Sequence, residues 1–130
     1  MKVEILTLCD YAQTYGDRLT IVGAFSTVNA KEFPVNMADI SLVAKIVLDE
    51  HDNEKHDVTI TIKKDGEANP VFGPIAAPLD MSGNKGDVVE ANLILKIGRL
   101  TIPSQGKYNV IFSFDGNDTI TRLSAVAPKQ

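Results

Sequence analysis

The sequence predicts an all-β domain, an antiparallel sandwich of two sheets, and three observations favour this fold. Every second residue from Tyr108 to Phe114 is apolar, so a strand there would bury one face. Asp115-Gly116 can adopt the left-handed dihedrals of a hairpin turn, and residues 119–125 supply a returning strand. Similar strand patterns recur along the chain without a convincing long helix between them, which is typical of a sandwich or barrel.

The first two strand patterns lie in residues 3–11 and 19–26, and Gly16-Asp17 forms the turn between them. In the first, the apolar alternation shifts phase by one residue, which predicts a β-bulge or a strand that changes sheets. In the second, Gly23 interrupts the apolar face, which indicates a bend or a close backbone approach.

The middle of the chain supplies three more patterns. A longer connection over residues 29–39 leads to residues 40–48, whose even-numbered positions form an apolar face. Residues 58–63 alternate cleanly enough to leave one face in solvent, so we expect these two strands to pair as a hairpin. Prolines at three positions in residues 70–78 restrict any strand there to a sheet edge or to short pieces.

The last part of the chain completes the predicted domain. Residues 89–97 carry apolar residues at every odd position, and residues 98–106 then cross over to the strand that contains Tyr108. The sequence contains no internal repeat, low-complexity segment or candidate linker. We therefore expect residues 1–130 to form one sandwich domain.

Tyr108 helps to indicate which type of β-sandwich the chain forms. In immunoglobulin-like domains, a tyrosine near the start of the penultimate strand forms a hydrogen bond through its hydroxyl to the preceding corner, and Tyr108 stands where that corner would be. The other interpretation is that Tyr108 is only the first core aromatic of its strand. We predict an immunoglobulin-like arrangement, with a jelly roll as the alternative topology.

Composition excludes several classes of partner. The chain has 13 basic and 17 acidic residues, a formal net charge of −4, and no cluster of Lys or Arg, so nucleic acid is not an expected partner. No apolar run approaches the length of a membrane span. The N-terminal residues lack the features of a secretory signal and Cys9 is the only cysteine, so a cytoplasmic location is expected.

The segment from Asp49 to Asp57 gathers five carboxylates and both histidines of the chain. A metal site there could use Asp49, His51, Asp52 and His56, although neither the zinc nor the calcium spacing of ligands is present. The alternative is a solvated hairpin loop between two strands.

We find no recognisable set of catalytic residues in the sequence, so we predict neither an enzyme nor a cofactor. Cys9 stands beside Asp10, whose charge would oppose a thiolate, and no histidine lies in register with it. Cys9 is therefore interpreted as a buried structural cysteine. None of the serines sits in a Gly-x-Ser-x-Gly elbow.

Several aliphatic residues fall on strand faces that should point outward. If the strands at residues 40–48, 108–114 and 119–125 share one sheet, four of these residues form one exposed patch. The four residues are Val43, Val47, Ile111 and Leu123. This patch would be an interface for a homodimer or an unidentified protein partner, unless a loop such as the Phe33-Pro34 connection covers it.

A resemblance supports the fold. The motifs that carry it are Leu6-x-Leu8-Cys9-Asp10-Tyr11-Ala12, Gly16-Asp17-x-Leu19-x-Ile21-x-Gly23-Ala24-Phe25, Phe33-Pro34 and Ser41-Leu42-Val43-Ala44-Lys45-Ile46. In this order and separation they resemble a family of short bacterial proteins described only as a domain of unknown function, and the resemblance extends to Gly106-x-Tyr108. It implies a stand-alone bacterial β-sandwich without an established activity, in which His56 is a shared residue.

The sequence therefore leaves two classes of function. The first is a non-enzymatic module for protein interaction or self-association. The alternative is a small-ligand or metal-binding sandwich that uses the loop at residues 49–57.

Overall fold

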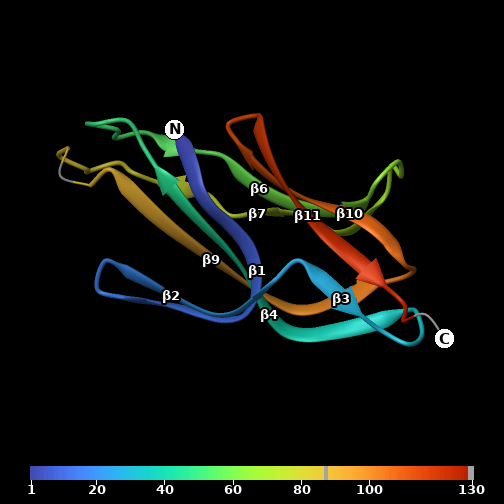
Figure 1. Cartoon of the computed structure of the whole chain (residues 1–130). Helices are drawn as coiled ribbons and strands as arrows, with labels where there is room; N and C mark the ends of the chain where they lie inside the picture. The colour runs from blue at the N-terminus through green and yellow to red at the C-terminus, as the bar shows by residue number, and fades with distance from the viewer. Residues whose placement is uncertain (87, 129–130) are drawn as a thin grey trace.

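The computed structural model describes residues 1–86 and 88–128 of the chain, and within these residues it contains strands and no helix (Figure 1). The prediction of an all-β fold is confirmed. The strands are β1 (Lys2–Tyr15), β2 (Arg18–Phe25), β3 (Thr27–Asn29), β4 (Val35–Val47), β5 (Lys55–His56), β6 (Val58–Lys64), β7 (Pro70–Ala76), β8 (Leu79–Asp80), β9 (Glu90–Ile102), β10 (Gly106–Phe114) and β11 (Asn117–Val126). Residues 87, 129 and 130 of the predicted 1–130 domain lie outside the described residues.

The strands form two larger sheets and one small one. The first sheet has the order β2-β1-β4-β9 and is antiparallel throughout. The second has the order β3-β11-β10-β6-β7, in which only the β3–β11 pair is parallel. Strands β5 and β8 form the small sheet. The proline-rich strand β7 lies at a sheet edge, as its composition predicts.

The two larger sheets contribute to one hydrophobic core. The predicted inward sets of β4 and β10 are buried there, because alternate side chains of a strand point to one face. Its largest fully buried members include Leu8, Leu42 and Ile46 from the first sheet and Ile60, Tyr108, Phe112 and Leu123 from the second.

Two details of the sequence-based fold are wrong, and three short strands were not predicted. Strand β4 begins at Val35, inside the segment expected to be a connection. The strands at residues 40–48 and 58–63 do not pair, because β4 belongs to the first sheet whereas β6 pairs with β10 and β7 in the second. The short strands β3, β5 and β8 have too few residues to show an alternation.

The first sheet bends along a line that crosses its strands. Strand β1 pairs with β4 only as far as Cys9 and Ser41, and beyond that point it continues with β2 alone (Figure 1). Along this line Gly23 and Asp39 have φ values of +68° and +53°. The left-handed region at residue 23 favours glycine, and a Cβ atom there would also meet the Asp10 side chain.

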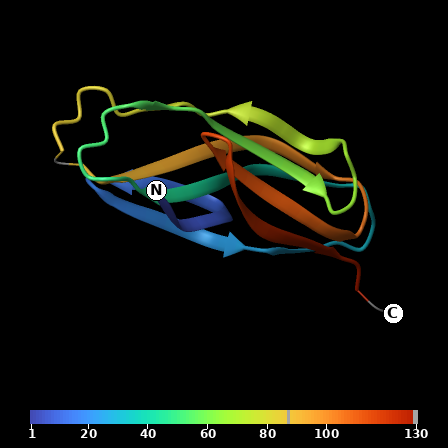
Figure 2. The same ribbon diagram turned by 90° about the horizontal axis from the view of Figure 1, so that it is seen from above.

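Beyond the bend, the β1–β2 hairpin packs against the outer face of the first sheet. Ala12 of the hairpin forms a second buried cluster with Cys9 and Val43, and three half-buried residues pack around it: Leu19, Ile21 and Ile94. At the tip of the hairpin, Asp17 lies beside the start of β9, where both line one hollow. Figures 1 and 2 show the tip at the same end of the molecule as the loop that follows β8.

Candidate functional site

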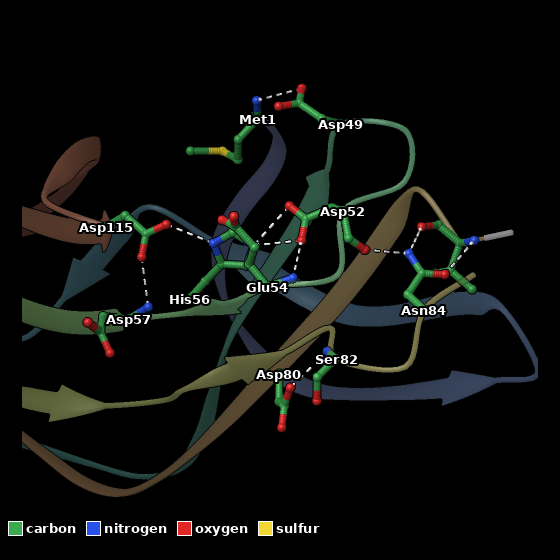
Figure 3. Close-up of polar contacts among 11 residues, drawn as sticks. Met1, Asp49, Asp52, Glu54, His56, Asp57, Asp80, Ser82, Asn84 and Asp115 are labelled. Carbon is green, nitrogen blue, oxygen red and sulfur yellow. Dashed lines mark hydrogen bonds and ion pairs between the residues drawn. The ribbon is translucent and has the colours of Figure 1, made fainter. Parts of the chain in front are cut away.

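His56 is held between two carboxylates (Figure 3). It ends β5, its side chain is only 7% exposed, and its ring stacks on Phe114 with 4.6 Å between centroids. Nδ1 lies 2.7 Å from Asp115 Oδ2, and Nε2 lies 2.9 Å from each carboxylate oxygen of Asp52. Both ring nitrogens therefore face an anionic acceptor, which is the arrangement that a doubly protonated imidazolium satisfies.

The two carboxylates are themselves positioned by backbone groups. The Asp57 N–H donates to Asp115 Oδ1 at 2.8 Å, and the Glu54 N–H donates to Asp52 Oδ1 at 3.1 Å. The Asn84 side-chain amide donates to the Asp52 carbonyl at 2.7 Å. The cluster thus ties together the loop before β5, the loop after β8 and the β10–β11 turn.

The hydrogen bonds of this cluster shift the pKa values of His56, Asp52 and Asp115 toward their charged forms. Burial of the ring disfavours the charged form of His56, but the hydrogen bonds with Asp115 and Asp52 outweigh it and raise the His56 pKa. The hydrogen bond with His56 is the main cause that lowers the pKa of Asp52 and also that of Asp115. Both ring nitrogens of His56 are thus engaged by carboxylates, and the group of Asp52, His56 and Asp115 is called the charged clamp.

The four residues of the predicted metal site do not converge. His56 and Asp52 contact each other, whereas the exposed His51 side chain lies 3.7 Å from Glu50, and Asp49 pairs with the N-terminal amine. Within residues 1–86 and 88–128, no group of three or more His, Cys, Asp and Glu side chains is arranged to hold a metal ion. Asp115, the second partner of His56, comes from a turn that sequence reasoning did not connect with this loop.

The predicted aliphatic patch is not formed. Val43 and Leu123 are 0% exposed, and Val47 and Ile111 are half-buried. Val43 and Val47 belong to the first sheet, whereas Ile111 and Leu123 belong to the second. Val43 is covered by the β1–β2 hairpin and not by the Phe33-Pro34 connection. Leu123 pairs with Tyr108 and lies in the core.

An exposed face of the β1–β2 hairpin was missed. Tyr11 is 49%, Tyr15 75% and Val22 52% exposed. Tyr11 pairs with Val22, and Tyr15 pairs with Arg18, so these side chains share the face of the hairpin opposite to Ala12 and Ile21. The sequence signal for this face was that the alternation that includes Tyr11 continues through Gln13 and Tyr15, beyond the end of the predicted first strand.

Comparison with protein families gives a match over almost the whole chain. The model of DUF6941, described as a family of unknown function, matches residues 4–124. The chain belongs to the DUF6941 family. No curated protein and no solved structure matches it. The family match agrees with the sequence resemblance to a domain of unknown function.

Cys9 of this DUF6941 chain lies in an environment that opposes reactivity. It is fully buried in the second cluster, between the first sheet and the hairpin. Burial is the main cause that raises its pKa, and the Asp10 charge acts in the same direction. A nucleophilic cysteine needs its thiolate stabilised, so these surroundings favour a packing role.

Proposed function

We propose that this DUF6941 chain is a non-enzymatic interaction module that binds a protein partner through the outer face of the β1–β2 hairpin, here defined as Tyr11, Gln13, Tyr15, Arg18, Thr20 and Val22. The proposal includes an immunoglobulin-like sandwich as the scaffold and the bacterial cytoplasm as the location. It rests on the exposure of two tyrosines and a valine on one projecting element.

The composition of this face matches a binding surface. Tyrosine buries a large area on binding for a small loss of conformational freedom, and Tyr and Arg are enriched at the energetic centres of interfaces. Arg18 is the only charged side chain of the face, so the partner surface that fits it is apolar and carries a carboxylate. The inner residues of the hairpin are anchored against the first sheet, so the face is presented by a rigid element.

The tyrosine corner supports the scaffold part of the proposal. Tyr108 follows Gly106 at the start of the penultimate strand, and its hydroxyl donates to the Ser104 carbonyl at 2.6 Å. This is the hydrogen bond that immunoglobulin-like domains make at the corresponding corner. The shared core of two open sheets is consistent with such a sandwich, and a jelly roll is the alternative.

Site-specific photocrosslinking in the cells that naturally produce the chain tests this function. A benzophenone amino acid in place of Tyr15 is expected to give a discrete covalent adduct, because the ring at this position would be covered by the partner. The matched control is the same substitution at Ile120, which is 55% exposed on the second sheet. Mass spectrometry of the adduct identifies the partner, and an adduct of twice the chain mass identifies a second copy.

Two results would contradict the proposal. The first is the absence of adducts from positions 11, 15 and 22 in protein that remains folded. The second is an equally strong adduct from the Ile120 control, because the interaction would then not be specific to the hairpin.

A further inference from the structure

Strand β9 lies at one edge of the first sheet and pairs with β4 alone in the part of the chain that the structure describes. The other edge strands of the two larger sheets are short or protected: β3 has 3 residues, β7 carries Pro70 and Pro74, and β2 is interrupted by Gly23. Strand β9 has 13 residues and no proline. A long, unprotected edge strand is a template for pairing with another chain.

Every second residue at the start of β9 points its backbone groups to this free edge. The Leu48 N–H donates to the Val89 carbonyl at 2.6 Å, so the backbone of Val89 faces β4. Inward and outward positions alternate along an antiparallel ladder, and the pairing of β9 with β4 is regular over residues 90–97. The residues that present free N–H and C=O groups to a new strand are therefore Glu90, Asn92, Ile94 and Lys96.

The hollow between the hairpin tip and the start of β9 lies at the same edge. It measures about 310 Å³, and its lining includes Asp17, Glu90 and Asn92. The Glu90 side chain is 49% exposed, and its carboxylate lies 3.8 Å from Lys45 Nζ. The side-chain oxygen of Asn92 is buried and has no hydrogen-bond donor within residues 1–86 and 88–128. A buried acceptor of this kind requires an explanation, and a donor from a second molecule would supply one.

Strand β9 itself carries the cation that complements this hollow. Lys96 is exposed and forms no salt bridge among the described residues. If two copies of β9 pair antiparallel about a two-fold axis at Leu93, Lys96 of each copy lies opposite Glu90 of the other, and Asn92 lies opposite Ile94. These four residues are the ones with free backbone groups, so the same register forms the hydrogen bonds of a ladder.

Charge selects this register among the symmetric ones. Glu90 is the only acidic residue of β9, and its cations are Lys96 and Arg99. A two-fold axis perpendicular to the sheet places opposite each other only residues that are an even number of positions apart, because opposite residues share a face. Arg99 is therefore excluded as the partner of Glu90. An axis at Lys96 would place two like charges opposite each other.

We propose that β9 pairs with β9 of a second copy of the chain, antiparallel and centred on Leu93, so that Lys96 of each copy enters the hollow of the other. Glu90, Asn92 and Lys96 lie on the same face of the strand, so the ammonium meets the carboxylates of the hollow beside the Asn92 oxygen. On the opposite face, half-buried Leu93 and Leu95 pack at the border of the core, and the second copy would cover them. The first sheets of the two copies then form one continuous sheet.

Sedimentation equilibrium of the purified chain over a wide range of concentrations tests this dimer. The natural chain is expected to approach twice the mass of one chain as its concentration rises. Lys96→Glu and Glu90→Lys should each weaken dimerisation by roughly tenfold or more, because like charges would face each other on both sides of the axis. An equimolar mixture of these two variants should dimerise again, because each copy then meets only opposite charges.

Two further variants separate the edge from the charge. Asn92→Pro removes a free backbone N–H without loss of a hydrogen bond to β4, so it should also prevent dimerisation. Arg122→Glu is the matched control, because it reverses an exposed charge on β11 of the second sheet and should leave the dimer unchanged. Circular dichroism verifies that each variant is folded.

Three results would overturn the proposal. The first is a natural chain that stays monomeric at every concentration. The second is a dimer that neither charge reversal weakens, because the contact would then lie elsewhere. The third is a mixture of Lys96→Glu and Glu90→Lys chains that stays monomeric although both are folded. The partner proposed for the hairpin contacts a different surface, so its crosslinking test is decided separately.

Discussion

Replacement of His56 with alanine is expected to lower the free energy of unfolding by about 3 kcal/mol at pH 6. The substitution would remove the donors that face Asp52 and Asp115 and the ring that stacks on Phe114. The Asp52 side chain is only 11% exposed, so water replaces its lost partner poorly. Urea denaturation followed by circular dichroism measures the change.

The second histidine of the same loop provides the control. His51 is 75% exposed at its side chain, so His51→Ala should change the stability by less than about 0.5 kcal/mol. Equal losses for the two variants would show that the paired carboxylates of His56 do not stabilise the fold.

The same cluster predicts a stability that depends on pH. The His56 pKa is raised in the folded chain, so its contribution is complete below the unfolded value of about 6.5 and is lost as the pH rises through the folded pKa. The pKa values of Asp52 and Asp115 are lowered, so their contribution is present above about pH 3.9 and is lost as the pH falls through the folded values.

The stability lost in His56→Gln should therefore be largest between about pH 4 and 6.5 and smaller on both sides. Glutamine retains hydrogen-bonding groups but carries no charge, so this variant isolates the electrostatic part of the interaction. Unfolding curves of both proteins at a series of pH values measure the difference, and a difference that does not change with pH would contradict the charged clamp.

The sequence identified the right loop for this cluster but not its chemistry. His56 and Asp52 are four residues apart, and their density of charge was visible within residues 49–57. Asp115 is 59 residues from His56, in a turn whose sequence indicates only its backbone conformation. The Asp115 carboxylate comes from another part of the fold. The sequence alone therefore could not distinguish a His56 that is hydrogen-bonded at both ring nitrogens from a His56 that binds a metal ion.

The order of the strands in the two larger sheets could not be predicted from the sequence either. Alternation predicts which face of a strand is buried, but it does not say what covers the other face. Val43 illustrates this, because β4 packs on the core through one face and beneath the hairpin through the other. A strand covered on both faces has the same apolar sequence as a strand with an exposed patch. The hairpin that makes the difference depends on the bend at Gly23, whose direction the sequence does not specify.

Tyr108→Ala is expected to lower the free energy of unfolding by about 4 kcal/mol, and Tyr108→Phe by about 1–2 kcal/mol. Tyr108 is 0% exposed, so alanine would leave a cavity in the core, whereas phenylalanine would remove only the hydroxyl, which donates to the Ser104 carbonyl at 2.6 Å and accepts from the Ser104 N–H at 3.4 Å. Tyr15→Phe is the matched control, because the Tyr15 side chain is 75% exposed and its hydroxyl can bond to water. Denaturant unfolding of the three variants separates the packing of the ring from the hydroxyl bond. If Tyr108→Phe were as stable as the Tyr15→Phe control, the hydrogen bond from Tyr108 to the Ser104 carbonyl would contribute nothing to stability. The proposed immunoglobulin-like scaffold would then lose the main evidence that a single residue provides for it.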